Sequence, residues 1–234
     1  MPNSRAFELF KESLVMVEEL LRIERESCHN PPRLEEQKMA QGLRGGAVVL
    51  MVASFENFLK QVFEEYLSTL TVHPPIPFDR LPEKMRITCM ELTLEYAMKG
   101  PPFQPRPPIS QRLVDIDKAC RMLVYQGVNP SVFSDTHSNP NSKTVRSMFS
   151  NVGIERIFDI IKARFESEWQ PRGVAHTYIP DKLDEIVNRR HIVAHRADVL
   201  NVTRSDLNES LKFLKVLAKM LDLELERHVT VIKK

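Results

Sequence analysis

The sequence predicts an all-α helical bundle, and three observations lead to this fold class. Apolar residues recur at spacings of three and four along most of the chain, as they do on the buried face of an amphipathic helix. Alternation with a period of two never extends over a useful length, and neither a glycine-rich phosphate loop nor an internal repeat is found. Prolines gather between the periodic segments, where they end helices. With 234 residues, 42% of them hydrophobic, we expect one domain over residues 1–234.

The second of the first two predicted helices forms the centre of the bundle. A helix over about residues 5–26 carries apolar residues at alternating three- and four-residue spacing. A longer helix over about residues 34–70 is apolar on nearly every face in its middle, which is typical of a buried central helix. Gly45 and Gly46 interrupt it, and each costs about 1 kcal/mol relative to alanine. These glycines indicate the close approach of another helix or subunit.

The middle third of the chain, residues 73–178, is predicted to be an inserted helical layer with proline-rich connectors. In chain order we expect helices over about residues 83–99, 109–126, 143–151 and 154–165. The segments 127–142 and 166–178 lack periodicity and are expected to be irregular.

Three residues of the irregular segments have a functional interpretation beside a structural one. Asp135 and His137 are of types that act in catalysis, but a loop rich in Ser, Asn and Pro favours a surface role. Trp169, close to Arg172, could stack an unpaired base. A buried tryptophan that anchors its loop is the favoured interpretation.

The chain ends in two predicted helices that are joined by a short turn. The first opens at Pro180 and Asp181, because proline suits the first helical turn and acidic residues favour its positive end. The second begins at a capping box from Thr203 to Asp206 and carries a continuous leucine-rich seam. We expect the first and the last helix of the chain to pack against the central one.

The overall composition limits where the protein acts and what it binds. Its 33 basic and 31 acidic residues give a formal charge of +2, so any contact with RNA must be local. The three cysteines are widely spaced, which predicts neither a disulfide framework nor a paired metal site and favours a reducing cytosol. The N-terminus lacks the pattern of a signal peptide, and the longest apolar run, residues 47–53, is too short to span a bilayer. We expect a cytoplasmic protein without a membrane partner.

The helix before the last one concentrates groups that can do chemistry. Within three turns it carries Glu185, Arg189, Arg190, His191 and His195. Glu185 and Arg189 have the i, i+4 spacing that supports a helix. At about 100° per residue, His191 and His195 project within roughly 40° of each other, whereas Arg190 and His195 diverge by about 140°. A two-fold axis could set the Arg/His pair of one chain against that of another, so the spacing favours a composite site in a homodimer.

These residues resemble a known motif. The pattern Glu-x3-Arg-Arg-His-x3-His is similar to the signature of the HEPN superfamily of metal-independent ribonucleases, and in particular to its RiboL-PSP and MAE types. The core of that signature is an arginine, a polar residue, three further residues and a histidine, which Arg190, His191 and His195 match. Glu185 fills the upstream acidic position and Arg189 stands where the family often has lysine. Asparagine is commoner than histidine at the polar position.

The resemblance covers about residues 3–70 and 180–228, and it implies a HEPN-like helical bundle. A second segment supports it, because the Phe-Glu-x-Phe block around Glu56 is similar to one in the second helix of some HEPN families. Glu56 is either an acid paired with Lys60 at i, i+4 or a supporting residue near the site. For residues 73–178 the resemblance implies nothing.

The expected activity is endonucleolytic cleavage of RNA by attack of its own 2'-hydroxyl, without a metal or cofactor. His195 suits a general base or acid, and Arg190 offers a planar charge for the phosphate, with Arg189 or Arg196 as auxiliary RNA contacts. His191 orients His195 or titrates with it, or forms a hydrogen bond across the dimer. The resemblance implies the same division of roles and products that end in a 2',3'-cyclic phosphate.

Other interpretations stay open. His191 and His195 could bind zinc together with Glu185, but no glutamate follows His191 and no third ligand is evident. A catalytically inactive HEPN-like dimer that binds RNA or a protein would need nearly the same residues. A purely structural dimer with a satisfied internal charge network is a third alternative. Likeness to bacterial defence and toxin families suggests an antitoxin or a sensor protein as a further partner.

Overall fold

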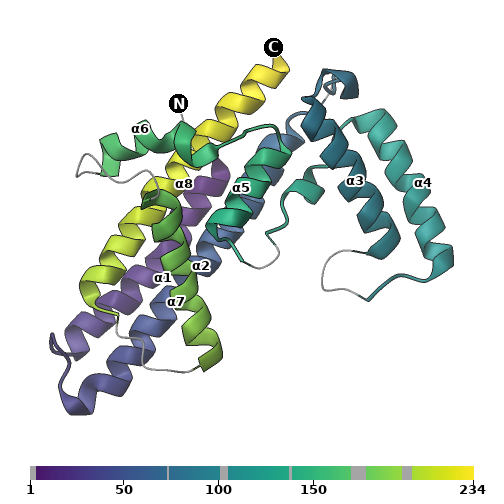
Figure 1. Cartoon of the computed structure of the whole chain (residues 1–234). Helices are drawn as coiled ribbons and strands as arrows, with labels where there is room; N and C mark the ends of the chain where they lie inside the picture. The colour runs from purple at the N-terminus through teal and green to yellow at the C-terminus, as the bar shows by residue number, and fades with distance from the viewer. Residues whose placement is uncertain (1–3, 73, 101–104, 137–138, 170–177, 197–201) are drawn as a thin grey trace.

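Every regular element in the described part of the chain is a helix, which confirms the all-α prediction. The computed structural model describes residues 4–72, 74–100, 105–136, 139–169, 178–196 and 202–234 (Figure 1). Its α-helices are α1 (Arg5–Ser27), α2 (Gln37–Ser68), α3 (Glu83–Lys99), α4 (Ile109–Gln126), α5 (Ser142–Asn151), α6 (Ile157–Trp169), α7 (Tyr178–Arg196) and α8 (Arg204–Lys233). Three short 3-10 turns accompany them: η1 (Leu34–Glu36), η2 (Phe78–Arg80) and η3 (Pro130–Phe133).

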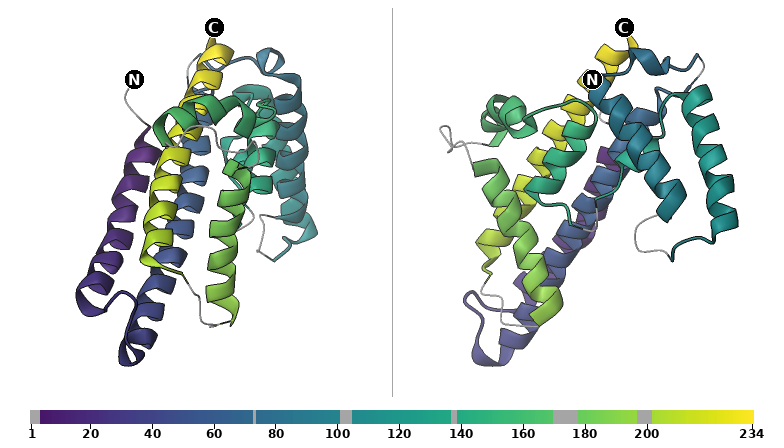
Figure 2. Two further views of the ribbon diagram at one scale, coloured as in Figure 1. Left: turned by 60° about the vertical axis from the view of Figure 1, so that its left-hand side comes forward. Right: turned by 45° about the vertical axis from the view of Figure 1, so that its right-hand side comes forward.

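The central helix α2 lies between α1, α8 and α7, and its middle is buried (Figure 2). Aromatic rings fill the space between α1 and α2, where the ring centroids of Phe10 and Phe58 are 5.3 Å apart and those of Phe7 and Phe58 are 6.3 Å apart. Tilted and edge-on pairs of this kind stabilise beyond the burial of their area. The prediction that the first and last helices pack on the central one is confirmed.

The middle third contributes to the same core as the outer helices. Phe149 of α5 packs edge-on against Phe63 of α2 at 5.0 Å, and Phe165 of α6 packs against Phe213 of α8 at 5.5 Å. The buried apolar side chains of all these helices form one cluster. α3 and α4 form a hairpin at one side of the bundle, where they contact η2, η3 and α5 (Figures 1 and 2). Met85 and Cys89 of α3 also belong to the common cluster. The single domain over residues 1–234 stays a prediction that the continuous core supports.

Trp169 is buried, as expected, but it anchors the last turn of α6 and not an irregular loop. Only 5% of its surface is exposed. Its ring stacks on Phe165 at 5.7 Å and meets Phe213 edge-on at 5.8 Å. These contacts also explain why the boundary predicted for α6 was wrong: the helix continues through Trp169, because Phe165 and Trp169 are one turn apart and pack on the same helix α8. Arg172 lies outside the described residues.

Other helix ends also differ from the prediction. The long second helix begins with the 3-10 turn η1 and its α-helical part stops at Ser68, two residues before the predicted end. α6 begins at Ile157 because Gly153 and Arg156 both have positive φ, of 94° and 56°, which an α-helix excludes. The loop predicted over residues 127–142 contains η3 and the first residue of α5.

One described helical segment, Leu34–Ser68, is long and apolar enough to cross a membrane by length and composition alone. Of its apolar window, 56% is buried inside the structure. Burial of this kind is what the central helix of a bundle requires.

Candidate functional site

α7 carries the motif residues. One side of this helix packs against α2, where a glycine of α2 allows a close approach. Ile186 and Val187 are buried, and Val193 packs against Gly45 of α2. A Cβ atom at Gly45 would lie 3.2 Å from Cγ1 of Val193, which is tighter than ordinary van der Waals contact. The expected close approach of another helix at this glycine is thus observed, and it sets the depth at which the C-terminal half of α7 lies on α2. A Cβ atom at Gly46 would lie 3.5 Å from Cδ1 of Leu20, which is an ordinary van der Waals distance.

Gly45→Ala is expected to stabilise the fold less than Gly42→Ala, or to destabilise it. Alanine gains about 1 kcal/mol of helix propensity at either position. At Gly42 nothing lies within 4 Å of the added methyl group, whereas at Gly45 it would crowd Val193. Overpacking costs about 1–3 kcal/mol, so urea unfolding should show a clear gain for Gly42→Ala only. An equal gain at both positions would contradict the tight contact, and adding Val193→Ala should relieve the crowding.

A second side of α7 faces α8 and is occupied by Arg189. Its guanidinium forms an ion pair with Glu185 and donates a hydrogen bond to Oγ of Ser210 at 3.3 Å. Close by, Nζ of Lys182 lies 3.4 Å from Oε1 of Glu209 on α8. The i, i+4 pairing expected for Glu185 and Arg189 is present. Arg189 and Lys182 therefore tie α7 to α8. Arg189 is turned by about 100° from Arg190 around the helix.

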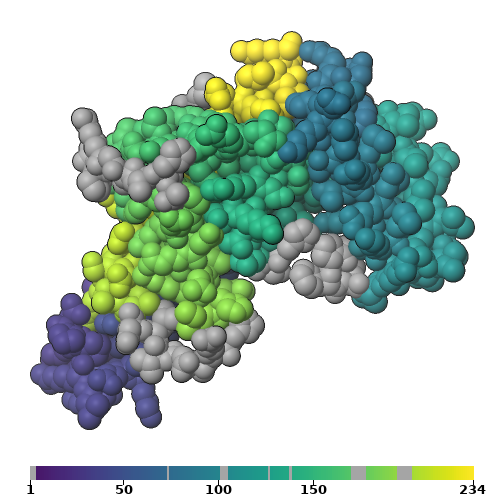
Figure 3. Space-filling view, viewed as in Figure 1, coloured from purple at the N-terminus to yellow at the C-terminus, as the bar shows by residue number. Residues whose placement is uncertain are grey.

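The third side of α7 opens into a cavity of about 510 Å³ that it shares with the segment before α5. Its lining residues are Asn139, Asn141, Lys143, Asp184, Val187, Asn188, Arg190 and His191. Arg190 is half-buried at the cavity and His191 is exposed. The space-filling view shows α5 and α7 side by side on this face of the molecule (Figure 3). Two of the three core motif residues thus line one polar cavity.

Asp184 fixes the two walls of the cavity to each other. Its carboxylate accepts hydrogen bonds from the backbone N–H and from the hydroxyl of Ser142, both at 2.7 Å. Ser142 is the first residue of α5, and Oδ1 of Asn141 caps that helix by accepting from the N–H of Thr144 at 2.9 Å. An acidic residue this close to the start of α7 would ordinarily serve the positive N-terminal end of its own helix. The observed role of Asp184 is to satisfy the first amide of another helix.

Glu56 supports the same region from α2. Its Oε1 atom accepts a hydrogen bond from the hydroxyl of Thr136 at 3.0 Å and pairs with Lys60 at 2.7 Å. Thr136 is fully buried and its carbonyl accepts from the N–H of Asn139 at 3.1 Å. The i, i+4 ion pair expected for Glu56 is present, and the hydrogen bond to Thr136 links Glu56 toward a cavity-lining residue. Its supporting role near the site stays a prediction.

The remaining motif positions lie at the end of α7. The helix continues through residue 196, so position 195 follows position 191 by one turn on the same face. The side chains of His195 and Arg196 lie outside the described residues, and so does His137. The zinc interpretation of the His191 and His195 pair therefore falls outside them as well. Among the described side chains, no three of His, Cys, Asp or Glu gather in a way that could hold a metal ion.

The cavity is electrostatically suited to an anion. Lys143 and Arg190 both line it, and neither forms an ion pair with another described residue. The one carboxylate of the lining, Asp184, is occupied by Ser142. Two cations beside polar amides form a local positive site within a nearly neutral chain, as the expected local RNA contact requires.

No sequence pattern predicted the wall of the cavity that comes from the middle third of the chain. Lys143, Asn139 and Asn141 lie in or beside a segment expected to be an irregular surface loop. The one available signal was local, since an asparagine before Ser142 is a typical helix N-cap. Asp135, also considered for catalysis, accepts a hydrogen bond from the hydroxyl of Tyr96 at 2.8 Å and lines a neighbouring cavity of about 400 Å³.

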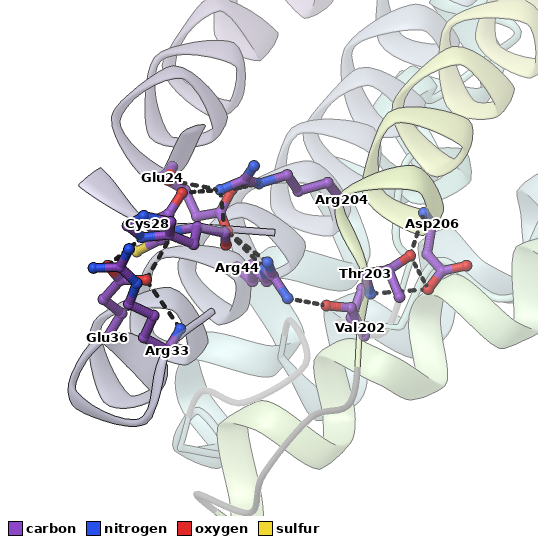
Figure 4. A network of polar contacts seen from close by, with 10 residues as sticks. Glu24, Cys28, Arg33, Glu36, Arg44, Val202, Thr203, Arg204 and Asp206 are labelled. Atoms are coloured by element: carbon purple, nitrogen blue, oxygen red, sulfur yellow. Dashed lines mark hydrogen bonds and ion pairs between the residues drawn. The ribbon is translucent and has the colours of Figure 1, made fainter. Parts of the chain in front are cut away.

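A buried ionic network holds the start of α8, just after the connection that leaves α7 (Figure 4). Glu24 of α1 is fully buried and pairs with Arg44 of α2 at 2.6 Å and with Arg204 of α8 at 2.5 Å. Arg44 also donates to the carbonyl of Val202 at 3.0 Å, and Arg204 donates to the carbonyl of Cys28 at 2.6 Å. The network therefore joins three helices and fixes the far end of the α7–α8 connection.

The predicted capping box then begins α8. Oγ1 of Thr203 accepts from the N–H of Asp206 at 3.1 Å, and Oδ2 of Asp206 accepts from the N–H of Thr203 at 2.9 Å. The backbone N–H and the hydroxyl of Thr203 both donate to the Asp206 carboxylate and hold its pKa below the usual value, with smaller contributions from Arg189 and Lys182. The cap is confirmed as predicted.

Comparison with known proteins supports the resemblance seen in the motif. A family model described as RiboL-PSP-HEPN matches residues 17–227, a range that includes the middle third. No curated protein and no solved structure was found to match the chain. HEPN domains commonly bind RNA and act as dimers, and many are ribonucleases, so a nuclease-type or RNA-related role is indicated. Because the match spans most of the chain and agrees with the suspected superfamily, the protein belongs to the RiboL-PSP-HEPN family.

Proposed function

We propose that this protein is a metal-independent endoribonuclease that cuts RNA by attack of the 2'-hydroxyl on the adjacent phosphorus. The observation that carries the proposal is the cavity beside α7, where Arg190 and His191 meet Lys143 in a chain of the HEPN superfamily. A planar guanidinium matches phosphate oxygens, and an imidazole can exchange protons near neutral pH. The arrangement thus supplies the two kinds of group that this reaction needs.

The proposed reaction is a transesterification that balances within the RNA and the side chains. A general base removes the proton of the 2'-hydroxyl, and the oxygen forms a bond to phosphorus. The bond between phosphorus and the 5'-oxygen breaks, and this oxygen receives a proton. The products are a 2',3'-cyclic phosphate and a 5'-hydroxyl. We assign the proton transfers to His195 and the stabilisation of the charged phosphorane to Arg190.

The other motif residues have positioning roles in this proposal. His191 orients the reacting groups, since it lines the cavity one turn before position 195 on the same helix face. Arg189 and Glu185 hold α7 on α8 through the contacts with Ser210 and with each other. This pairing favours a supporting role for Arg189 over a direct RNA contact. Arg196 stays a proposed auxiliary contact to the RNA backbone.

We further propose that the active form is a homodimer with a composite site. Arg190 and position 195 diverge by about 140° around α7, so a second copy related by a two-fold axis would bring an arginine and a histidine together. A cytoplasmic role in bacterial defence or as a toxin fits the likeness to such families, and an antitoxin or sensor protein is the partner expected in that setting.

The proposed activity predicts that purified protein cleaves a structured RNA in the presence of EDTA. The measurement is gel analysis of the RNA together with the chemistry of the new ends, which should be a 2',3'-cyclic phosphate and a 5'-hydroxyl. A matched substrate with a 2'-deoxynucleotide at the cleaved position should not be cleaved, because it lacks the 2'-hydroxyl that acts as the nucleophile. Cleavage that requires an added metal ion, or that leaves a 3'-hydroxyl, would contradict the proposal.

The second candidate is a catalytically inactive HEPN-like dimer that binds RNA or a protein. It is favoured by the same cavity, because groups sufficient to bind phosphate are nearly those that cleave it. RNA binding without any cleavage under these conditions would support this candidate over the nuclease.

A further inference from the structure

The cavity beside α7 has a second wall, and that wall offers its own set of ligand-binding groups. Lys143, Asn139 and Asn141 approach from the segment that leads into α5, opposite Asn188 and Arg190 of α7. Nothing in the motif requires this wall, because it is formed by the middle third of the chain. Two hydrogen bonds from Ser142 to the carboxylate of Asp184, each 2.7 Å long, hold this wall in place.

Lys143 offers a second phosphate contact that is separate from Arg190. Its side chain is exposed, lines the cavity and forms no ion pair with another described residue. The N-terminus of α5 is not itself the anion site, because the amide of Ser142 is bound by Asp184 and that of Thr144 by Asn141. The positive charge in this wall is therefore the ammonium group of Lys143.

The amides around Lys143 suit the edge of a base. Asn139 and Asn188 are exposed at the cavity, and Asn141 uses Oδ1 for its cap, which leaves its NH₂ group as a donor. An asparagine amide presents a donor and an acceptor side by side, which is the pattern that base edges offer. Base edges are accessible in single-stranded RNA, whereas they are enclosed in the deep groove of an RNA duplex.

We propose that this wall is a subsite for the nucleotide next to the scissile phosphate of single-stranded RNA. Lys143 binds the phosphate that follows or precedes the one at Arg190, and the asparagine amides bind the edge of the base between them. The proposal rests on the nuclease function proposed above and adds the requirement for a second phosphate and an unpaired base.

The test compares Lys143→Gln with Arg146→Gln. Both residues are exposed cations on α5, three positions apart, but Arg146 lines a different cavity of about 580 Å³ and lies over the ring of Phe158 at 5.2 Å. Lys143→Gln should lower kcat/KM for a tetranucleotide by about tenfold, the effect of one charged hydrogen bond. The same substitution should leave kcat/KM for a dinucleotide unchanged, because a dinucleotide has only the scissile phosphate. Arg146→Gln should change neither.

Binding of an uncleavable 2'-O-methyl tetranucleotide provides the independent readout. For Lys143→Gln the slope of log affinity against log salt should fall by about 0.7, the value for one phosphate contact on a single strand. The slope for Arg146→Gln should equal that of wild type. Circular dichroism melts confirm that both variants are folded.

The outcomes separate the two proposals. If wild type cuts RNA and Lys143→Gln behaves like Arg146→Gln, the subsite is overturned and the nuclease stands. An equal loss on dinucleotide and tetranucleotide also overturns the subsite, because Lys143 would then act at the scissile phosphate. If wild type binds the 2'-O-methyl RNA through Lys143 but cuts no RNA, the subsite stands as a binding site and the nuclease fails. If wild type neither binds nor cuts, both proposals fall.

Discussion

Replacing Arg190 or His195 with alanine is expected to reduce the rate of RNA cleavage by a large factor. Loss of one donor that stabilises transition-state charge costs about 10²–10³-fold, and loss of a general acid or base costs about 10²–10⁴-fold. Single-turnover cleavage of a defined RNA in EDTA measures both effects. Arg190→Lys should recover only part of the rate, because an ammonium group is a point charge without the planar geometry of guanidinium.

Arg121→Ala is the matched control for the loss of a cationic side chain. Arg121 is exposed on α4, where it pairs with Asp117 one turn away, and α4 contributes nothing to the cavity beside α7. It should cleave as fast as wild type. Cleavage by Arg190→Ala or His195→Ala within about threefold of this control would remove that residue from the proposed mechanism.

Mixing the two alanine variants tests whether the site is composite. If one chain supplies the arginine and its partner the histidine, each mixed dimer has one intact site, and about a quarter of the wild-type rate should return after exchange of subunits. A site built within a single chain would give no recovery once the mixed dimer has been demonstrated.

Glu24→Gln is expected to destabilise the fold by about 3–5 kcal/mol, the cost of leaving buried charges unpaired. Glu24 is fully buried between Arg44 and Arg204, so the neutral amide would leave two arginines without their counter-ion. Urea unfolding should show a much lower midpoint with an unchanged slope. Loss of the network should also loosen Val202, whose carbonyl is held by Arg44.

Glu19→Gln provides the control on the same helix. Glu19 also pairs with an arginine, Arg22, at 2.8 Å, but the Glu19 side chain is 54% exposed. Exposed pairs contribute about 0–1 kcal/mol, so the midpoint should hardly move. Similar losses for Glu19→Gln and Glu24→Gln would show that burial does not set the contribution of the Glu24 network.

The helices could largely be predicted because their signals are local. Prolines, caps and apolar periodicity fix the ends of α3 and α4, and the capping box at Thr203 fixes the start of α8. The end of α6 could not be placed, because its last turn is held by the packing of Trp169 on a helix about 40 residues later in the chain. Tertiary contacts set such helix boundaries, and the apolar periodicity within one segment does not reveal those contacts.

Only the part of the candidate site that lies on α7 could be predicted, because its signal is local to that helix. The spacing around one helix turns Arg189 by about 100° from Arg190, and the structure accordingly places Arg189 against α8 and Arg190 at the cavity. What these sides face depends on the fold. Lys143 and Asn139 reach the cavity only because Asp184 bonds to Ser142, 42 residues away, and no sequence pattern encodes that pair.

The Glu24 network joins residues that are 180 positions apart, and this distance has a consequence for biosynthesis. A ribosome releases α1 and α2 long before Arg204 emerges, so Glu24 lacks one of its two arginines while most of the chain is being made. The face of α2 that α8 covers is also open during that time. The core is therefore completed only after α8 has left the ribosome, and the helix that carries the motif residues reaches its final packing at that late stage.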